Sequence, residues 1–143
     1  RGTALAMKEP VGVIAALCPD TAPLLGLISL MAPAIAMGNR ITLIASDPFP
    51  LAATDFYQVL ETSDVPAGVV NILTGDHAAL APDLAKHMDI DALWSFPSQD
   101  LAQPIEALSA TNLKRTWITQ SPTIKASLHA ATEVKNVWIP YGE

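Results

Sequence analysis

One apolar stretch near the N-terminus predicts the centre of the fold. Residues 11–17 are apolar without alternation, as expected for a parallel strand that is covered on both faces. A long apolar helix is predicted over 23–37. Gly38 and Asn39 stop this helix because both residues tolerate a left-handed backbone. A second strand follows over 40–44, so the stretch fits one right-handed βαβ crossover.

The remaining chain continues to alternate helical and strand patterns with short loops. Asp76 and Ser98 stand where they can cap the helices that follow them. We expect an α/β fold, a Rossmann-like open and mostly parallel sheet with helices on both faces. The further predicted helices cover 51–61, 77–87 and 98–109, and the further predicted strands cover 69–73, 90–95 and 113–119.

The two ends of the chain predict extended structure outside this alternation. Within a single domain, 1–143, we expect a lead-in strand over 1–8, a βα core over 9–119, a linker over 120–132 and a terminal strand region over 133–143. Residues Glu133–Ile139 alternate as a strand does, so they need a sheet edge. We expect that edge on another chain, or on the lead-in strand within a small oligomerisation sheet.

Composition narrows the class of protein. Half of the 143 residues are hydrophobic and 15% are charged, which is typical of a globular domain. The net charge of −6 argues against a nucleic-acid partner. Helix 23–37 is too short for a membrane span and contains Pro33. One cysteine, Cys18, excludes a disulfide framework and fits a cytoplasmic location, and its apolar surroundings predict a buried structural thiol.

Several motifs, in order along the chain, resemble the NAD(P)-dependent aldehyde dehydrogenase family. They are EPVGVI from residue 9, LMAPAIAMGNRITL from 30, VPAGVVNILTGD from 65, HMDIDALWSFPS from 87, NLKRTWIT from 112 and LHAATEVKNVWI from 128. Several motifs that follow one another in the family's order identify the family more specifically than any single motif does. The resemblance implies a Rossmann-type cofactor domain and a terminal strand that extends the sheet of a neighbouring module.

The resemblance also implies that the catalytic positions have changed. Thr21 lies where the family has its oxyanion-hole asparagine, and a hydroxyl is a poor substitute for that amide N–H. Thr119 lies where the family has its general-base glutamate, and a threonine has no side-chain pKa suited to that task. We therefore predict no catalytic residue in this chain, and the histidine spacing matches no common metal site.

The cofactor positions match only in part. The family's ribose-binding lysine falls on Ile44 and its glutamate on Asp47, while the glycine of its phosphate-binding pair falls on Pro97. Candidate cofactor-binding residues are Ser46, Asp47 and Ser98, which we expect to be vestigial. The interpretation that we favour is that they are ordinary caps of the helices that follow.

Between Thr119 and Glu133 the family carries a whole domain with its nucleophilic cysteine, which is absent here. This deletion resembles the C-terminal module of the long, two-module (family 16 type) aldehyde dehydrogenases. We predict a non-catalytic module, cut from a longer chain, that acts structurally beside a catalytic aldehyde dehydrogenase module. We expect the partner to be such a module or subunit. We expect no cofactor in this chain, and NAD(P) in the parent protein, which would be an NAD(P)-dependent aldehyde dehydrogenase. The alternative is the NAD(P)-binding portion of an active aldehyde dehydrogenase whose catalytic cysteine lies outside this chain.

Overall fold

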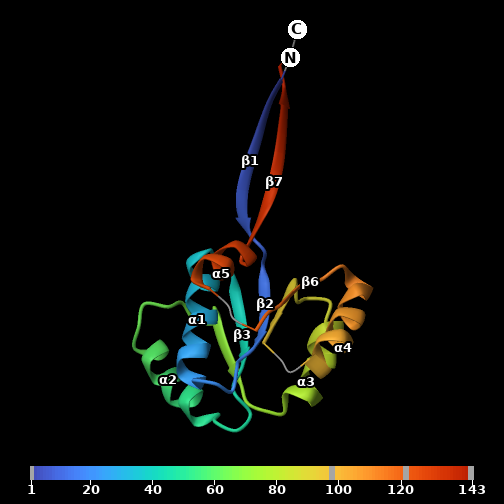
Figure 1. Ribbon diagram of the computed structural model, residues 1–143. Coiled ribbons are helices and arrows are strands. Elements are labelled where there is room, and N and C mark those ends of the chain that lie inside the picture. Colours follow the sequence, from blue (N-terminus) through green and yellow to red (C-terminus); the bar gives the residue numbers. More distant parts are fainter. Residues whose placement is uncertain (1, 97–98, 121–122, 142–143) are drawn as a thin grey trace.

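The computed structural model describes residues 2–96, 99–120 and 123–141. It consists of a layered α/β core and a two-stranded arm that projects from one end of the core, with both chain ends at its tip (Figure 1). The strands are β1 (Gly2–Pro10), β2 (Val13–Leu17), β3 (Arg40–Ile44), β4 (Val70–Leu73), β5 (Ala92–Ser95), β6 (Arg115–Ile118) and β7 (Thr132–Pro140). The helices are α1 (Pro23–Ala36), α2 (Leu51–Glu61), α3 (His77–Lys86), α4 (Gln99–Ser109) and α5 (Ile124–Ala130), with a 3₁₀ turn at Ala110–Asn112.

The core sheet is parallel and has the order β4-β3-β2-β5-β6. Helices α1, α2 and α5 cover one face, and α3 and α4 cover the other (Figure 1). Alternate residues of the central strand enter two separate apolar clusters, Ile14 and Ala16 on one face and Ala15 and Leu17 on the other. This double burial explains why the strand sequence lacks alternation. The predicted fold class is confirmed.

Asn39 connects parts of the core that are distant in sequence. Its side chain is buried, and its Nδ2 donates to the carbonyl oxygens of Ala34 at 3.0 Å and Ala131 at 2.9 Å. Its Oδ1 accepts from the backbone N–H of Gly12 at 2.9 Å. The asparagine therefore does more than end helix α1. It binds that helix to the end of α5 and to the loop before β2.

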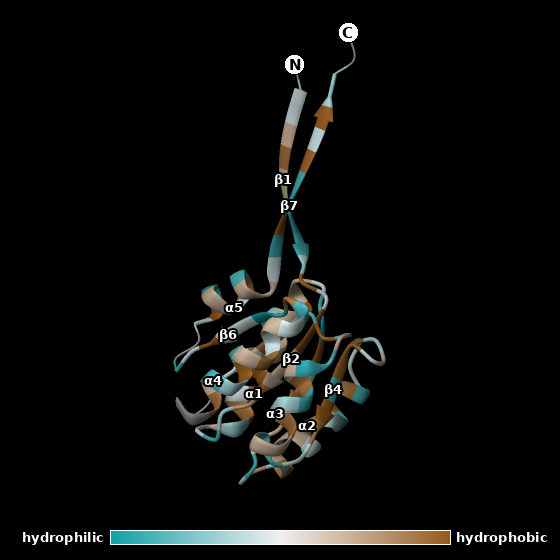
Figure 2. Cartoon of the chain, turned by 90° about the vertical axis from the view of Figure 1, so that its right-hand side faces the viewer, coloured by the Kyte–Doolittle hydropathy of each residue, from teal (hydrophilic) through white to brown (hydrophobic). Residues whose placement is uncertain are grey.

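The arm is an antiparallel pair of nine-residue strands, β1 and β7. Its register runs from Gly2 opposite Pro140 to Pro10 opposite Thr132. The predicted terminal strand thus finds its edge on the lead-in strand of the same chain. Figure 2 shows that apolar segments continue along both strands of the arm, away from the core.

Two local predictions differ from the structure. The expected linker 120–132 contains helix α5, whose N-cap Thr123 accepts a hydrogen bond from the backbone N–H of Ala126. Ser46 and Asp47 do not cap helix α2, because its N-cap residue is Pro50 and no side chain caps it. Among the described residues, no helix is long and apolar enough to cross a membrane.

Candidate functional site

The candidate site lies at the carboxyl edge of the core sheet. The chain runs from β2 to β3 and β4 on one side and then crosses to β5 and β6 on the other, so the strand order reverses between β2 and β5. Open α/β sheets bind ligands in the crevice outside this reversal point. A cavity of about 240 Å³ is found there. We call it the carboxyl-edge pocket; its lining residues are Leu17, Cys18, Pro19, Asp20, Asp47, Asp76, His77, Ala78, Ser95, Phe96 and Leu101.

Hydrogen bonds fix several polar groups of the carboxyl-edge pocket. The hydroxyl of Ser46, a buried residue just after β3, donates to Oδ1 of Asp20 at 2.7 Å. Nε2 of His77 lies 2.7 Å from the carbonyl oxygen of Ala45, so this nitrogen carries the proton. Oδ1 of Asp76 accepts from the backbone N–H of Ala78, which confirms the predicted cap of α3. Three polar residues at the pocket therefore also stabilise local structure.

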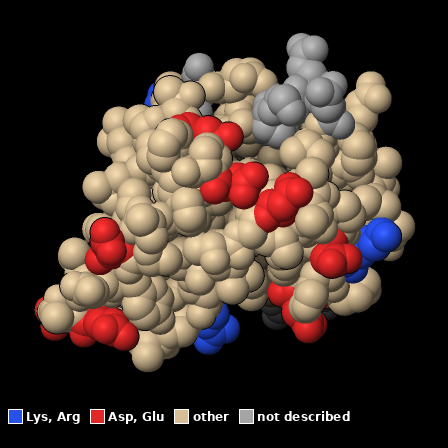
Figure 3. All heavy atoms as spheres, turned by 90° about the horizontal axis from the view of Figure 1, so that it is seen from below, with Lys and Arg blue, Asp and Glu red and all other residues tan. Residues whose placement is uncertain are grey.

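The pocket is acidic. Its lining includes the three aspartates at 20, 47 and 76 but no lysine or arginine among the described residues. Figure 3 views the molecule from the end opposite the arm, and acidic side chains spread over this face while basic ones lie near its margins. Such a surface repels anionic groups. The described residues include no group of three or more His, Cys, Asp or Glu side chains placed to hold a metal ion.

Cys18 lies directly after β2 in the wall of this pocket. It is 2% exposed, and burial raises the pKa of its thiol to about 12. The thiolate is the nucleophilic form, so this cysteine is unreactive at neutral pH. The predicted burial of this thiol is confirmed.

Of the other predicted site residues, Asp47 and Ser46 meet at this edge, but only Asp47 lines the pocket. The exposed residue Thr21 lines a neighbouring cavity of about 360 Å³, together with Gln120. The backbone N–H of Thr119 donates to the carbonyl oxygen of Ser95. Ser98 and Pro97 lie outside the described residues, as do 121 and 122.

Sequence reasoning did not single out Asp20 or Ser95 as site residues. Asp20 follows the first core strand by three residues, and Ser95 is the last residue of β5. Both positions lie at the carboxyl ends of neighbouring parallel strands. This placement was the signal that could have identified them.

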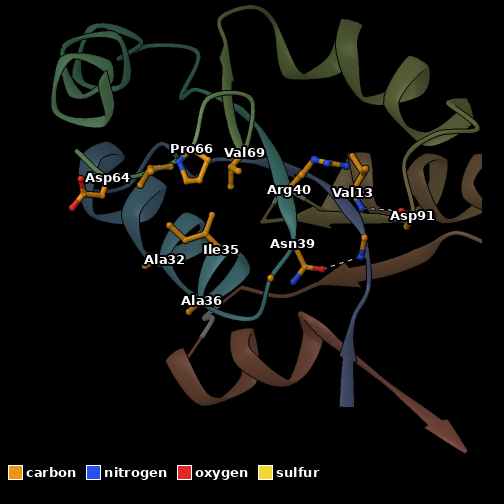
Figure 4. Close-up of a pocket in the computed structure, with 13 residues that line it drawn as sticks. Val13, Ala32, Ile35, Ala36, Asn39, Arg40, Asp64, Pro66, Val69 and Asp91 are labelled. Atoms are coloured by element: carbon orange, nitrogen blue, oxygen red, sulfur yellow. Dashed lines mark hydrogen bonds between the residues drawn. The ribbon is translucent and has the colours of Figure 1, made fainter. Parts of the chain in front are cut away.

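A larger cavity, of about 1030 Å³, lies at the opposite edge of the sheet, where the arm joins the core. Figure 4 shows Asn39 bonded to the Gly12 backbone and Asp91 bonded to the backbone N–H of Val13 there. The labelled apolar side chains include Ile35 and Val69. The amide of Asn39 and the carboxylate of Asp91 already bind backbone groups. We therefore interpret the polar residues of this cavity as structural rather than catalytic.

Comparison with known proteins identifies the origin of this framework. The profile of the Aldehyde dehydrogenase family matches residues 1–122. The NADP/NAD-dependent aldehyde dehydrogenase PuuC of Escherichia coli (strain K12) is 34% identical over 116 residues, which are 80% of this chain and 23% of that protein. Aldehyde dehydrogenase 1A1 of Gallus gallus is 33% identical over 140 residues, 93% of this chain and 28% of that protein.

Solved structures of aldehyde dehydrogenases also match this chain. The crystal structure of indole-3-acetaldehyde dehydrogenase in its apo form superposes with a TM-score of 0.78 and 34% identity, over 82% of this chain and 27% of that one. The chain thus spans about a quarter of the length of the relatives it matches. The framework of the sheet, its helices and the motifs carried on them place this chain in the aldehyde dehydrogenase family.

Proposed function

We propose that this chain is a non-catalytic aldehyde-dehydrogenase-like module with a structural role. It pairs through the strand Glu133–Ile139 with another aldehyde dehydrogenase module or subunit. The long two-module aldehyde dehydrogenases are the branch to which we assign it. The observation that carries the proposal is the arm, which extends apolar residues away from its own core (Figure 2).

The arm has two apolar faces. Leu5 lies directly opposite Val137, and residues that are opposite each other in an antiparallel pair share a face. Because side chains alternate along a strand, Ile139 lies on the same face as Leu5, and Trp138 lies on the other face. The side chains of Leu5, Ile139 and Trp138 are 43%, 46% and 83% exposed, respectively. An isolated two-stranded sheet is marginally stable in water, and its outer edges offer backbone groups to a further strand. A partner that covers both faces and extends the sheet stabilises this arm.

The positions of the family's chemistry support a non-catalytic role. Thr21 and Thr119 stand at the two catalytic positions named above, and neither side chain supplies an amide donor or a carboxylate base. Cys18, the single thiol of this chain, is buried and has a raised pKa. A module built in this way holds its partner rather than turning over an aldehyde.

The carboxyl-edge pocket does not fit a dinucleotide. Its volume of about 240 Å³ is below the roughly 300–1,000 Å³ of pockets for drug-sized ligands. Its described lining presents carboxylates, whereas a pyrophosphate needs N–H donors or positive charge. The hydroxyl of Ser46 is bonded to Asp20. We therefore propose that Ser46 and Asp47 do not bind a cofactor in this chain.

A second candidate function is the NAD(P)-binding portion of an active aldehyde dehydrogenase whose catalytic cysteine lies outside this chain. The observation in its favour is the similarity to PuuC, whose name records NADP and NAD dependence. In this case Asp47 would contact the ribose.

Sedimentation equilibrium tests the structural role. We expect the chain to associate at micromolar concentration, alone or with a catalytic aldehyde dehydrogenase subunit, and Trp138→Lys to weaken that association at least tenfold. Met88→Lys is the matched control, because Met88 is 74% exposed but lies on the core. Equal association of the two variants, or none by the unmodified chain with either partner, would contradict the role of the arm.

Calorimetric titration with NAD and NADP separates the two candidates. We expect no heat of binding at millimolar cofactor from a chain whose circular dichroism shows it to be folded. Saturable binding that disappears in Asp47→Ala would favour the second candidate.

A further inference from the structure

Ser95 is the unusual residue of the carboxyl-edge pocket. It ends β5, it is 0% exposed, and its hydroxyl has no hydrogen-bond partner among the described residues. Side chains alternate along a strand, so Ser95 lies on the same sheet face as Leu93, which packs in the cluster of Leu17. Leu17 and Ser95 both line the pocket. A buried hydroxyl without a partner carries a free-energy cost that a ligand can remove.

The rest of the lining determines the charge of a suitable ligand. Asp20, Asp47 and Asp76 approach from the ends of three different strands, β2, β3 and β4. Among the described lining residues there is no lysine or arginine to neutralise them. The small volume and this acidic rim favour a compact cation and disfavour phosphates.

We propose that the carboxyl-edge pocket binds small organic cations of the alkylammonium class. The hydroxyl of Ser95 accepts one ammonium N–H, and the rim carboxylates attract the positive charge. The methylene groups pack against Leu17 and Leu101. A metal ion is a poorer fit, because the described residues form no metal-holding cluster. This binding activity is independent of the pairing role of the arm.

The experiment is a titration of the isotope-labelled chain with 1,4-diaminobutane, followed by amide chemical shifts. We expect saturable shifts around Ser95 and His77, and no such shifts with 1,4-butanediol, which is similar in length but uncharged. We expect Asp47→Asn and Asp76→Asn each to raise the dissociation constant about three- to fivefold, in line with the strength of partly exposed ion pairs. Asp64→Asn, at the opposite edge of the sheet, is the matched control.

Ser95→Ala separates ligand contact from folding. We expect this variant to bind the diamine at least threefold more weakly and yet to melt at an equal or higher temperature, because it removes a buried hydroxyl without a partner. Unchanged diamine affinity in this variant would overturn the proposal. So would equal shifts with the diol, or equal weakening by Asp64→Asn. Loss of association in Trp138→Lys with diamine binding retained would show that the two proposals stand separately.

Discussion

At the scale of single residues, the polar side chains inside this domain hold backbone groups together. Asn39 satisfies two carbonyl oxygens and one N–H from three segments of chain. Lys114, also buried, donates to the carbonyl oxygens of His87 and Ile90. Burial lowers the pKa of Lys114, and nearby Asp91 raises it in part.

Replacing Asn39 with alanine should leave the backbone N–H of Gly12 without its partner. It should also remove one of the two hydrogen bonds at each of the carbonyl oxygens of Ala34 and Ala131, which keep their backbone N–H donors. We expect Asn39→Ala to lower the free energy of unfolding by about 2–4 kcal/mol, measured by urea denaturation. Asn71→Ala is the control, because Asn71 is exposed and its side chain donates to the carbonyl oxygen of Gly68, three residues earlier on the surface. A difference below about 0.5 kcal/mol between the two variants would contradict the role given to Asn39.

Cys18 should make the domain less stable at high pH. Its pKa is raised in the folded state to about 12, so above about pH 9 the unfolded chain loses a proton that the folded chain keeps. The free energy of unfolding then falls by up to about 1.4 kcal/mol per pH unit between pH 9 and 12. We expect Cys18→Ala to remove this part of the slope, as measured by urea denaturation at several pH values. Parallel pH profiles for the two proteins would show that the thiol does not contribute.

At the scale of elements, the short helix α5 depends on local capping. Oγ1 of Thr123 accepts the N–H of Ala126 at 3.2 Å, and the hydroxyl of Ser127 donates back to the carbonyl oxygen of Thr123 at 3.0 Å. Helices of seven residues are unstable alone, so this helix needs both its cap and its contacts with α1. Its stability also supports the arm, because β7 begins two residues after α5 ends.

We expect Thr123→Ala to lower the free energy of unfolding by about 1 kcal/mol through loss of the cap. Thr123→Ser keeps an oxygen at the same place and should cost at most a few tenths of a kcal/mol. Amide hydrogen exchange of residues 124–130 gives a local reading. Equal exchange rates in the two variants would mean that the tertiary contacts alone hold this helix.

At the scale of the whole molecule, the core and the arm are separate structural parts. The arm strands pair with each other, while the five-stranded sheet has its own two apolar clusters. At the junction, the N–H of Val11 donates to the carbonyl oxygen of Ala131. The core therefore does not need the arm in order to bury its apolar residues.

A chain shortened to residues 11–131 should fold. We expect its free energy of unfolding to stay within about 1–2 kcal/mol of the full chain, because the Val11 to Ala131 bond and both clusters remain. It should also lose the association proposed for the arm, with sedimentation as the measurement. An unfolded product, as judged by circular dichroism, would show that the arm stabilises the core.

The sequence determined the elements and their class. An unbroken apolar run at 13–17 and a strand pattern at 40–44, with an apolar helix between them, predict a parallel strand pair inside the sheet. The same residues carry the family motifs. These features are local, so they can be recognised from a short stretch of chain. The extended chain ends were also recognisable, and their alternation indicated pairing.

Only the tertiary structure decided which distant groups meet. Ser46 was interpreted as a helix cap, but it bonds to Asp20, 26 residues earlier. Asn39 reaches Ala131 across 92 residues, and β7 pairs with β1 at the other end of the chain. Local patterns encode burial and backbone shape, whereas hydrogen-bond partners and pocket walls depend on which strand ends lie together. The acidic pocket around Ser95 is therefore a property of the folded sheet, because its three aspartates follow three different strands.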